Sequence, residues 1–215
     1  MKEDKEIIKR NLITLSEKCQ SDNLFKGSFK NFIPENKKEL KNFIWVIVIS
    51  FVPSILTAFN KDTVLILLST TEIILNIIIA LFGIIFTGYA LLQSLMGDGV
   101  FKRLISSTIS KKKTSISIFQ ETIEKFSFLM FQYIGAIMIN IILILILNAI
   151  SSEYTICANI LVSNIVASIF ISIYYAIMIN VIFKVKNFVK NTVRLFNIFG
   201  LEKGIELLND TNDDD

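Results

Sequence analysis

The stretch TVLILLSTTEIILNIIIALFGIIFTGYALLQSLM, from Thr63 to Met96, decides the fold. It contains one charged residue, Glu72, and its other residues are apolar, small or uncharged. An α-helix needs about 20 mainly apolar residues to cross the hydrocarbon core of a bilayer. At about 1.5 Å per residue this segment is about 50 Å long as a helix, so it must tilt strongly or continue past the membrane. The segment therefore predicts a membrane-spanning helix.

Three further apolar segments predict three further spans, at residues 43–59, 127–150 and 155–183. The first is short and contains Pro53, which removes one backbone hydrogen bond and favours a kink. Residues 60–62 join the first two spans, and residues 151–154 join the last two. Because both connections are short, each pair of spans is an antiparallel hairpin. The predicted fold is all-α: an integral membrane protein with four transmembrane helices in two hairpins and cytoplasmic amphipathic helices.

The positive charges predict the orientation. Of the 22 lysines and arginines, only Lys61 lies in the two short turns. The others lie in segments that the positive-inside bias places in the cytoplasm, so both termini and the long loop are expected there. This gives five regions: a cytoplasmic N-terminal helical segment (1–42), transmembrane hairpin 1 (43–96), a cytoplasmic helical loop (97–126), transmembrane hairpin 2 (127–183), and a cytoplasmic C-terminal helix with an acidic tail (184–215).

The cytoplasmic segments carry amphipathic patterns. Residues 3–19 have apolar side chains on one helical face, and a helix opened by Pro34 is expected to run into the first span. In the loop, Gly97-Asp98-Gly99 is a break before an expected short helix at residues 100–109. The tail from Asp210 to Asp215 is expected to be disordered. These segments favour either a collar packed at the membrane or a docking surface for a soluble protein.

A stripe of small and polar residues follows one face of the second predicted span. Its members recur at steps of three and four residues, which places them on one side of a helix. They are Ser69, Glu72, Asn76, Ala80, Gly83, Thr87, Ala90 and Ser94. Such a stripe allows close helix packing, or it lines a water-filled passage.

A second pattern is a polar layer at the depth of Glu72. Its candidate members are Glu72, Asn76, Asn140, Asn164 and Ser168, which come from three spans. An ionisable group inside a membrane is expensive and is by default a functional candidate. We keep two interpretations open. Hydrogen bonds in this layer fix the packing of the bundle, with Glu72 protonated, or the layer forms an ion or proton passage with Glu72 as its selective group.

The composition argues against several classes of function. The chain has no histidine, and it has no motif typical of metallopeptidases, serine hydrolases or P-loop enzymes. We expect no enzyme activity, cofactor or metal. Cys19 and Cys157 are predicted to lie on opposite sides of the membrane, so no disulfide is expected. The net charge of +3 does not suggest direct nucleic-acid binding.

Three hypotheses of function remain. The first is a homo-oligomeric, channel-like or effector protein of a bacterial inner membrane, signalled by a soluble cytoplasmic partner. The second is a non-conducting sensor or scaffold that recruits such a partner, and the third is a small transporter. The layout resembles that of small four-pass bacterial membrane proteins that accompany antiphage defence and CRISPR-type systems. This resemblance of layout implies a defence role but assigns no residue to it.

Overall fold

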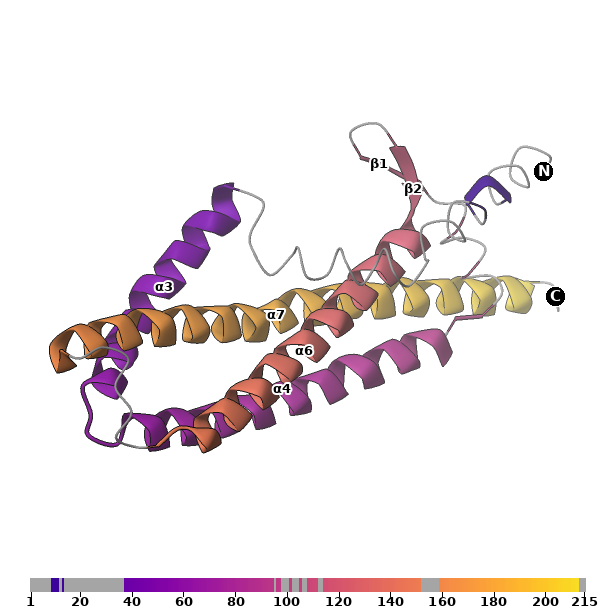
Figure 1. Ribbon diagram of the computed structural model, residues 1–215. Coiled ribbons are helices and arrows are strands. Elements are labelled where there is room, and N and C mark those ends of the chain that lie inside the picture. Colours follow the sequence, from indigo (N-terminus) through magenta and orange to yellow (C-terminus); the bar gives the residue numbers. More distant parts are fainter. Residues whose placement is uncertain are drawn as a thin grey trace. The chain divides into compact units, whose positions relative to one another are not determined.

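The computed structural model is almost entirely helical (Figure 1). It describes residues 9–11, 13, 37–94, 96–97, 101, 105, 108–111, 114–151 and 159–212. Within these residues, 4 helices are long and apolar enough to cross a membrane. The predicted fold class, a helical membrane protein with four spans, is therefore confirmed.

The first hairpin consists of α3 (Lys37–Ala58) and α4 (Thr63–Ser94). α3 starts before the predicted span, as expected for a helix that leads into the membrane, and it continues through Pro53. In the turn between the helices, the Asn60 side-chain oxygen accepts a hydrogen bond of 3.0 Å from the backbone N–H of Asp62. The Thr63 hydroxyl donates to the Asn60 carbonyl at 2.7 Å. These contacts fix the reversal of the chain at the start of α4.

The loop before the third span differs from the helical loop predicted at residues 97–126. β1 (Thr108–Lys111) and β2 (Thr114–Ser117) pair as antiparallel strands, with Thr108 opposite Ser117. Threonine and isoleucine, which are β-branched and favour extended backbone, occupy both strands. The helix expected at residues 100–109 is therefore wrong for residues 108 and 109, which belong to β1. Of residues 100–107, the structure describes only 101 and 105, both helical.

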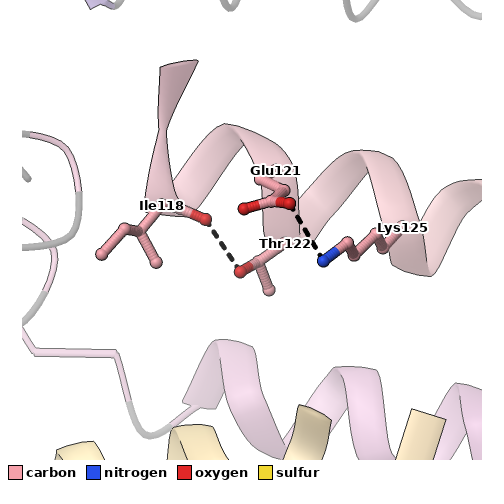
Figure 2. A network of polar contacts seen from close by, with 4 residues as sticks. All are labelled: Ile118, Glu121, Thr122 and Lys125. Atoms are coloured by element: carbon pink, nitrogen blue, oxygen red, sulfur yellow. Dashed lines mark hydrogen bonds and ion pairs between the residues drawn. The ribbon is translucent and has the colours of Figure 1, made fainter. Parts of the chain in front are cut away.

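The third span belongs to α6 (Ile118–Ala149), which starts directly after β2. Figure 2 shows its first turns, where the Thr122 hydroxyl donates to the Ile118 carbonyl at 2.8 Å. Glu121 forms an ion pair of 3.0 Å with Lys125, one turn further along. An acidic residue in the first turn also interacts favourably with the positive end of the helix dipole. These local contacts explain why the helix begins well before the predicted span at residue 127.

The last helix, α7 (Ile160–Asn212), combines the fourth span with the predicted C-terminal helix. It has no break at the predicted boundary near residue 183, where the sequence changes from apolar to amphipathic. α7 also extends into the predicted acidic tail and ends at Asn212. The residues after Gly204 include no proline or glycine, the two residue types that most readily end a helix. Residues 152–158, which include the predicted start of the fourth span, and residues 213–215 lie outside the described part.

The chain divides into two compact units. Unit 1 consists of Met1–Gly27, Ile84–Met130 and Lys186–Asp215, and unit 2 consists of Ser28–Gly83 and Phe131–Val185. Each of α4, α6 and α7 therefore contributes one part to each unit. Unit 2 contains all of α3 and the most apolar parts of the other helices, whereas unit 1 contains the hairpin β1–β2.

Buried side chains recur every seven residues on the long helices. On α4 the buried positions are Thr71, Ile78, Ile85 and Leu92. On α6 they include Phe119, Phe126, Tyr133, Asn140 and Leu147. A seven-residue repeat keeps the same face of a helix against its neighbour over several turns, as in left-handed helix bundles.

Candidate functional site

The polar stripe of α4 lies on the outside of the subunit. All eight of its side chains are exposed: Ser69, Glu72, Asn76, Ala80, Gly83, Thr87, Ala90 and Ser94. They lie on the side of the helix away from Thr71 and Ile78, which are fully buried. The predicted alignment of these residues along one face follows from helix geometry, and within the described part of the chain this face is exposed.

Glu72 is the most unusual residue of the stripe. At about 1.5 Å per residue it lies about 14 Å along the helix from Thr63, well within the span. Among the residues that the structure describes, it has neither a hydrogen-bond nor an ion-pair partner. Its neighbours Ile73 and Ile77 are exposed apolar side chains, as expected on a surface that meets lipid. An exposed carboxyl group among them costs about 2.5–3.5 kcal/mol at the bilayer centre unless water or protein covers it.

The backbone of α4 is accessible at Gly83. A methyl group built there would meet no atom within 4 Å, so the space beside this glycine is open in the subunit. Ala80 and Thr87, one turn away on either side, are also exposed. Small residues at this spacing let a second helix approach closely, which is the usual way that helices associate in membranes.

Asn140, another predicted member of the layer, is fully buried in unit 2. Its side-chain nitrogen donates to the Ala136 carbonyl at 2.7 Å and lies 3.3 Å from the sulfur of Met178. Its side-chain oxygen accepts a hydrogen bond of 2.6 Å from the Tyr174 hydroxyl. The Thr71 hydroxyl, on α4, donates to the Leu67 carbonyl of its own helix at 2.7 Å. The contacts of Asn140 therefore connect α6 and α7 inside unit 2.

The two remaining members of the layer lie on α7. Ser168 is buried, and its hydroxyl donates to the carbonyl of Asn164 at 2.8 Å. The side chain of Asn164 is partly exposed. Within the described part of the chain, no hydrogen bond or ion pair joins Asn140, Asn164 or Ser168 to Glu72. The five candidates therefore fall into an exposed pair on α4, Glu72 and Asn76, and a group on α6 and α7 that is largely buried.

Several polar residues of the interior were not identified from the sequence, among them Thr71, Tyr133 and Tyr174. Tyr133 is fully buried, and its hydroxyl donates to the Val181 carbonyl at 3.1 Å. The seven-residue repeat places Thr71 on a line with Ile78 on α4 and Tyr133 on a line with Phe126 on α6, but this pattern alone does not show that either line is buried. Tyr174 shows no such signal, since Tyr175 beside it is equally aromatic and more deeply buried.

In the described part of the chain, no three acidic, histidine or cysteine residues lie close enough together to hold a metal ion. The polar chemistry of the spans therefore consists of one carboxyl group, amides and hydroxyls. No protein family, curated protein or solved structure matches the chain.

Proposed function

We propose that the chain is one subunit of a homo-oligomeric, channel-like protein of a bacterial cytoplasmic membrane, in which α4 of each subunit faces a shared axis. The observation that supports this proposal is the exposure of Glu72 on a membrane-spanning helix without a partner in the described part of its own subunit. In a single subunit the carboxyl group would face hydrocarbon. Assembly around an axis removes this cost, because the stripe then faces other copies or water.

The chemistry of the stripe suits a narrow polar passage. Glu72 and Asn76, one turn apart on α4, would form adjacent rings of carboxyl and amide groups. Rings of carboxylates attract cations, and rings of amides replace part of an ion's hydration shell. Below them, Ala80 and Gly83 are small enough for neighbouring α4 helices to pack closely. We therefore expect a preference for cations over anions.

The distribution of positive charge supports the orientation in this proposal. Lys61 is the only lysine or arginine in the two short turns, and the other 21 lie in the remaining segments. On this basis both termini and the β1–β2 hairpin face the cytoplasm. Unit 1 would then be the part that receives a signal from a soluble partner, as an effector of a defence system would.

The test is ion flux through the full chain in liposomes, together with its mass in lipid nanodiscs. Gly83→Leu is the decisive variant, because the added side chain enters open space in the subunit but would separate neighbouring α4 helices. We expect it to lose both assembly and flux. Ile84→Leu, at the next and equally exposed position off the stripe, is the matched control and should retain both.

Glu72→Gln, measured in the same assay, separates assembly from selectivity. The amide keeps the shape and loses the charge, so the oligomer should persist while the ratio of potassium to chloride flux falls. A wild-type monomer, or unchanged assembly of Gly83→Leu, would contradict the proposal. An oligomer that conducts no ions would favour the second candidate, a non-conducting scaffold that recruits a soluble protein through unit 1.

A further inference from the structure

Unit 1 contains a cavity of about 220 Å³ between parts of α4, α6 and α7. Its walls are mainly aromatic and aliphatic, and they include Tyr89, Gln93, Phe119, Phe126, Leu195 and Phe199. Leu92 and Leu195 at its lining are almost completely buried, whereas Gln93 and Phe101 are exposed. The cavity therefore extends from the surface of unit 1 into its interior.

The walls are held by packing between aromatic rings. Phe101 and Phe119 meet edge to face at 5.1 Å between ring centres, and Tyr89 and Phe126 lie 5.6 Å apart. Phe126 also packs edge to face on Phe188, at 5.1 Å. Because each ring is fixed by another, the walls cannot easily close over the space. A partly open, mainly apolar cavity with a few polar groups is the usual form of a small-molecule site, so we expect it to have an occupant.

The lining determines the charge of that occupant. None of the described residues that line the cavity carries a charge. A charged group entering it would lose water without gaining a counter-charge, which is strongly unfavourable. Two polar groups of the lining form one small site: the side-chain nitrogen of Gln93 donates to the Tyr89 hydroxyl oxygen at 2.7 Å. The Tyr89 proton thus remains able to donate to a ligand, and the Gln93 carbonyl oxygen to accept from one. The hydroxyl of Thr122, also at the lining, donates to the Ile118 carbonyl of its own helix at 2.8 Å.

The volume sets the size of the occupant. An apolar protein cavity of about 150 Å³ binds one benzene molecule. The cavity in unit 1 has about one and a half times this volume, which fits a molecule of two fused rings. Aromatic walls favour such a flat body, because rings gain from edge-to-face and offset contacts in addition to burial.

We propose that this cavity binds a neutral, mainly apolar small molecule of about two fused rings, whose single acceptor group takes a hydrogen bond from the Tyr89 hydroxyl, which Gln93 orients. This proposal does not rest on the channel proposal, because every residue that lines the cavity belongs to unit 1. A ligand bound between α4, α6 and α7 stabilises the spacing of these helices at which it fits best. Binding would therefore act on α4, α6 and α7 together.

The test uses the full chain in lipid nanodiscs, labelled with 3-fluorotyrosine and observed by fluorine NMR. The chain has 5 tyrosines, so each signal can be assigned with a tyrosine-to-phenylalanine variant. The probe is 1-indanone, a neutral fused bicyclic ketone. We expect the Tyr89 signal to shift and saturate, while the signal of Tyr133, which is buried in unit 2, reports any general effect of the probe dissolved in lipid.

Two variants on α7 make the test specific. Leu195→Phe adds a ring at the lining of the cavity and should raise the half-saturating concentration at least about tenfold. Leu201→Phe makes the same change at a position that is 71% exposed and outside the lining, so it should bind like the wild type. An unchanged Tyr133 signal shows that unit 2 of each variant is folded, and a Tyr89 signal distinct from that of the unfolded chain shows the same for unit 1. Gln93→Leu, which removes the amide without filling the cavity, should weaken binding by a smaller factor.

Several results would overturn the proposal. One is a Tyr89 shift that rises linearly with 1-indanone, since this indicates partition into lipid. A second is equal binding to wild type and Leu195→Phe. A third is equal binding of indane-1-carboxylate, the charged analogue, because the uncharged lining should reject it. Finally, a lipid acyl chain that co-purifies in the cavity and is lost in Leu195→Phe would identify a different occupant.

Discussion

The two faces of α4 have the same period but different surroundings. The buried line is Thr71, Ile78, Ile85 and Leu92, and the exposed line includes Ser69, Asn76, Gly83 and Ala90, each at steps of seven residues. In a water-soluble helix the exposed line would simply be the solvated face. Within a membrane the exposed face meets lipid, for which aliphatic side chains are better suited. The polar and small residues on the exposed face of this spanning helix are therefore the basis of the proposed interface between copies.

Polar groups of the spanning helices have two different surroundings in this protein. Asn140 is surrounded by partners from its own subunit and ties α6 to α7 through Tyr174. Glu72 has no partner in the described part of the subunit and faces outward. Asn140 therefore stabilises the fold of one chain. The carboxyl group of Glu72 is favourable within a membrane only when water or a polar group covers it. Variants on the two sides should accordingly affect different measurements: unfolding on the inside, and assembly on the outside.

The largest expected effect comes from adjacent isoleucines on α4. Ile78 is 0% exposed and Ile79 is 48% exposed. Ile78→Ala removes buried packing and leaves a cavity, so we expect a loss of about 2 kcal/mol or more in the free energy of unfolding. Ile79→Ala should cost less than about 0.5 kcal/mol. Reversible unfolding of the monomer in detergent micelles measures both. Equal losses would mean that the assigned inner face of α4 is incorrect.

A smaller effect is expected for the buried amide of α6. Asn140→Leu leaves the Tyr174 hydroxyl without its acceptor at 2.6 Å. Hydrogen bonds between membrane helices contribute about 0.6 kcal/mol on average, and the unpaired hydroxyl adds a penalty, so we expect a loss of about 1 kcal/mol. Asn148→Leu is the control, because Asn148 is exposed and its amide bonds only within its own helix. The same unfolding assay compares them, and a stable Asn140→Leu would show that this amide is dispensable.

Much of the fold could be predicted from the sequence because the length of an apolar segment is set by the thickness of a membrane. The segment from Thr63 to Met96 corresponds closely to α4, which ends at Ser94. Boundaries outside the membrane were less predictable, since no such length constraint acts there. α7 continues to Asn212, and residues 108–111 and 114–117 form strands, although a helix was expected up to residue 109. Local preference and tertiary packing compete in such segments, and periodicity does not decide between them.

The candidate site was predictable in part for a different reason. Spacing alone places Glu72 and Asn76 on one face of a helix, but it does not say whether that face points inward. Both faces of α4 repeat every seven residues, so periodicity cannot distinguish them. Hydrophobicity does not resolve the ambiguity either, since lipid and the protein interior are similarly apolar. The contact between Asn140 and Tyr174, separated by 34 positions in the chain, required the packing of α6 against α7.

The smallest expected effect is the difference in unfolding free energy between two glycine-to-alanine substitutions on α4. A methyl group at Gly88 would lie 2.7 Å from the tip of the Phe188 ring, whereas one at Gly83 meets nothing within 4 Å. The Phe188 ring cannot turn aside freely, because it is buried and packs edge to face on Phe126 at 5.1 Å.

Alanine favours a helix over glycine by up to about 1 kcal/mol, and this gain applies at both positions. At Gly88 the crowding outweighs it, so we expect Gly88→Ala to lower the free energy of unfolding of the monomer by about 0.5 kcal/mol. Gly83→Ala should leave that free energy unchanged or raise it slightly, and its cost should appear only as weaker assembly in nanodiscs. If Gly83→Ala instead unfolds the monomer more easily, the open face of α4 already has a contact within the subunit. The stripe would then belong to the fold of one chain rather than to an interface between copies.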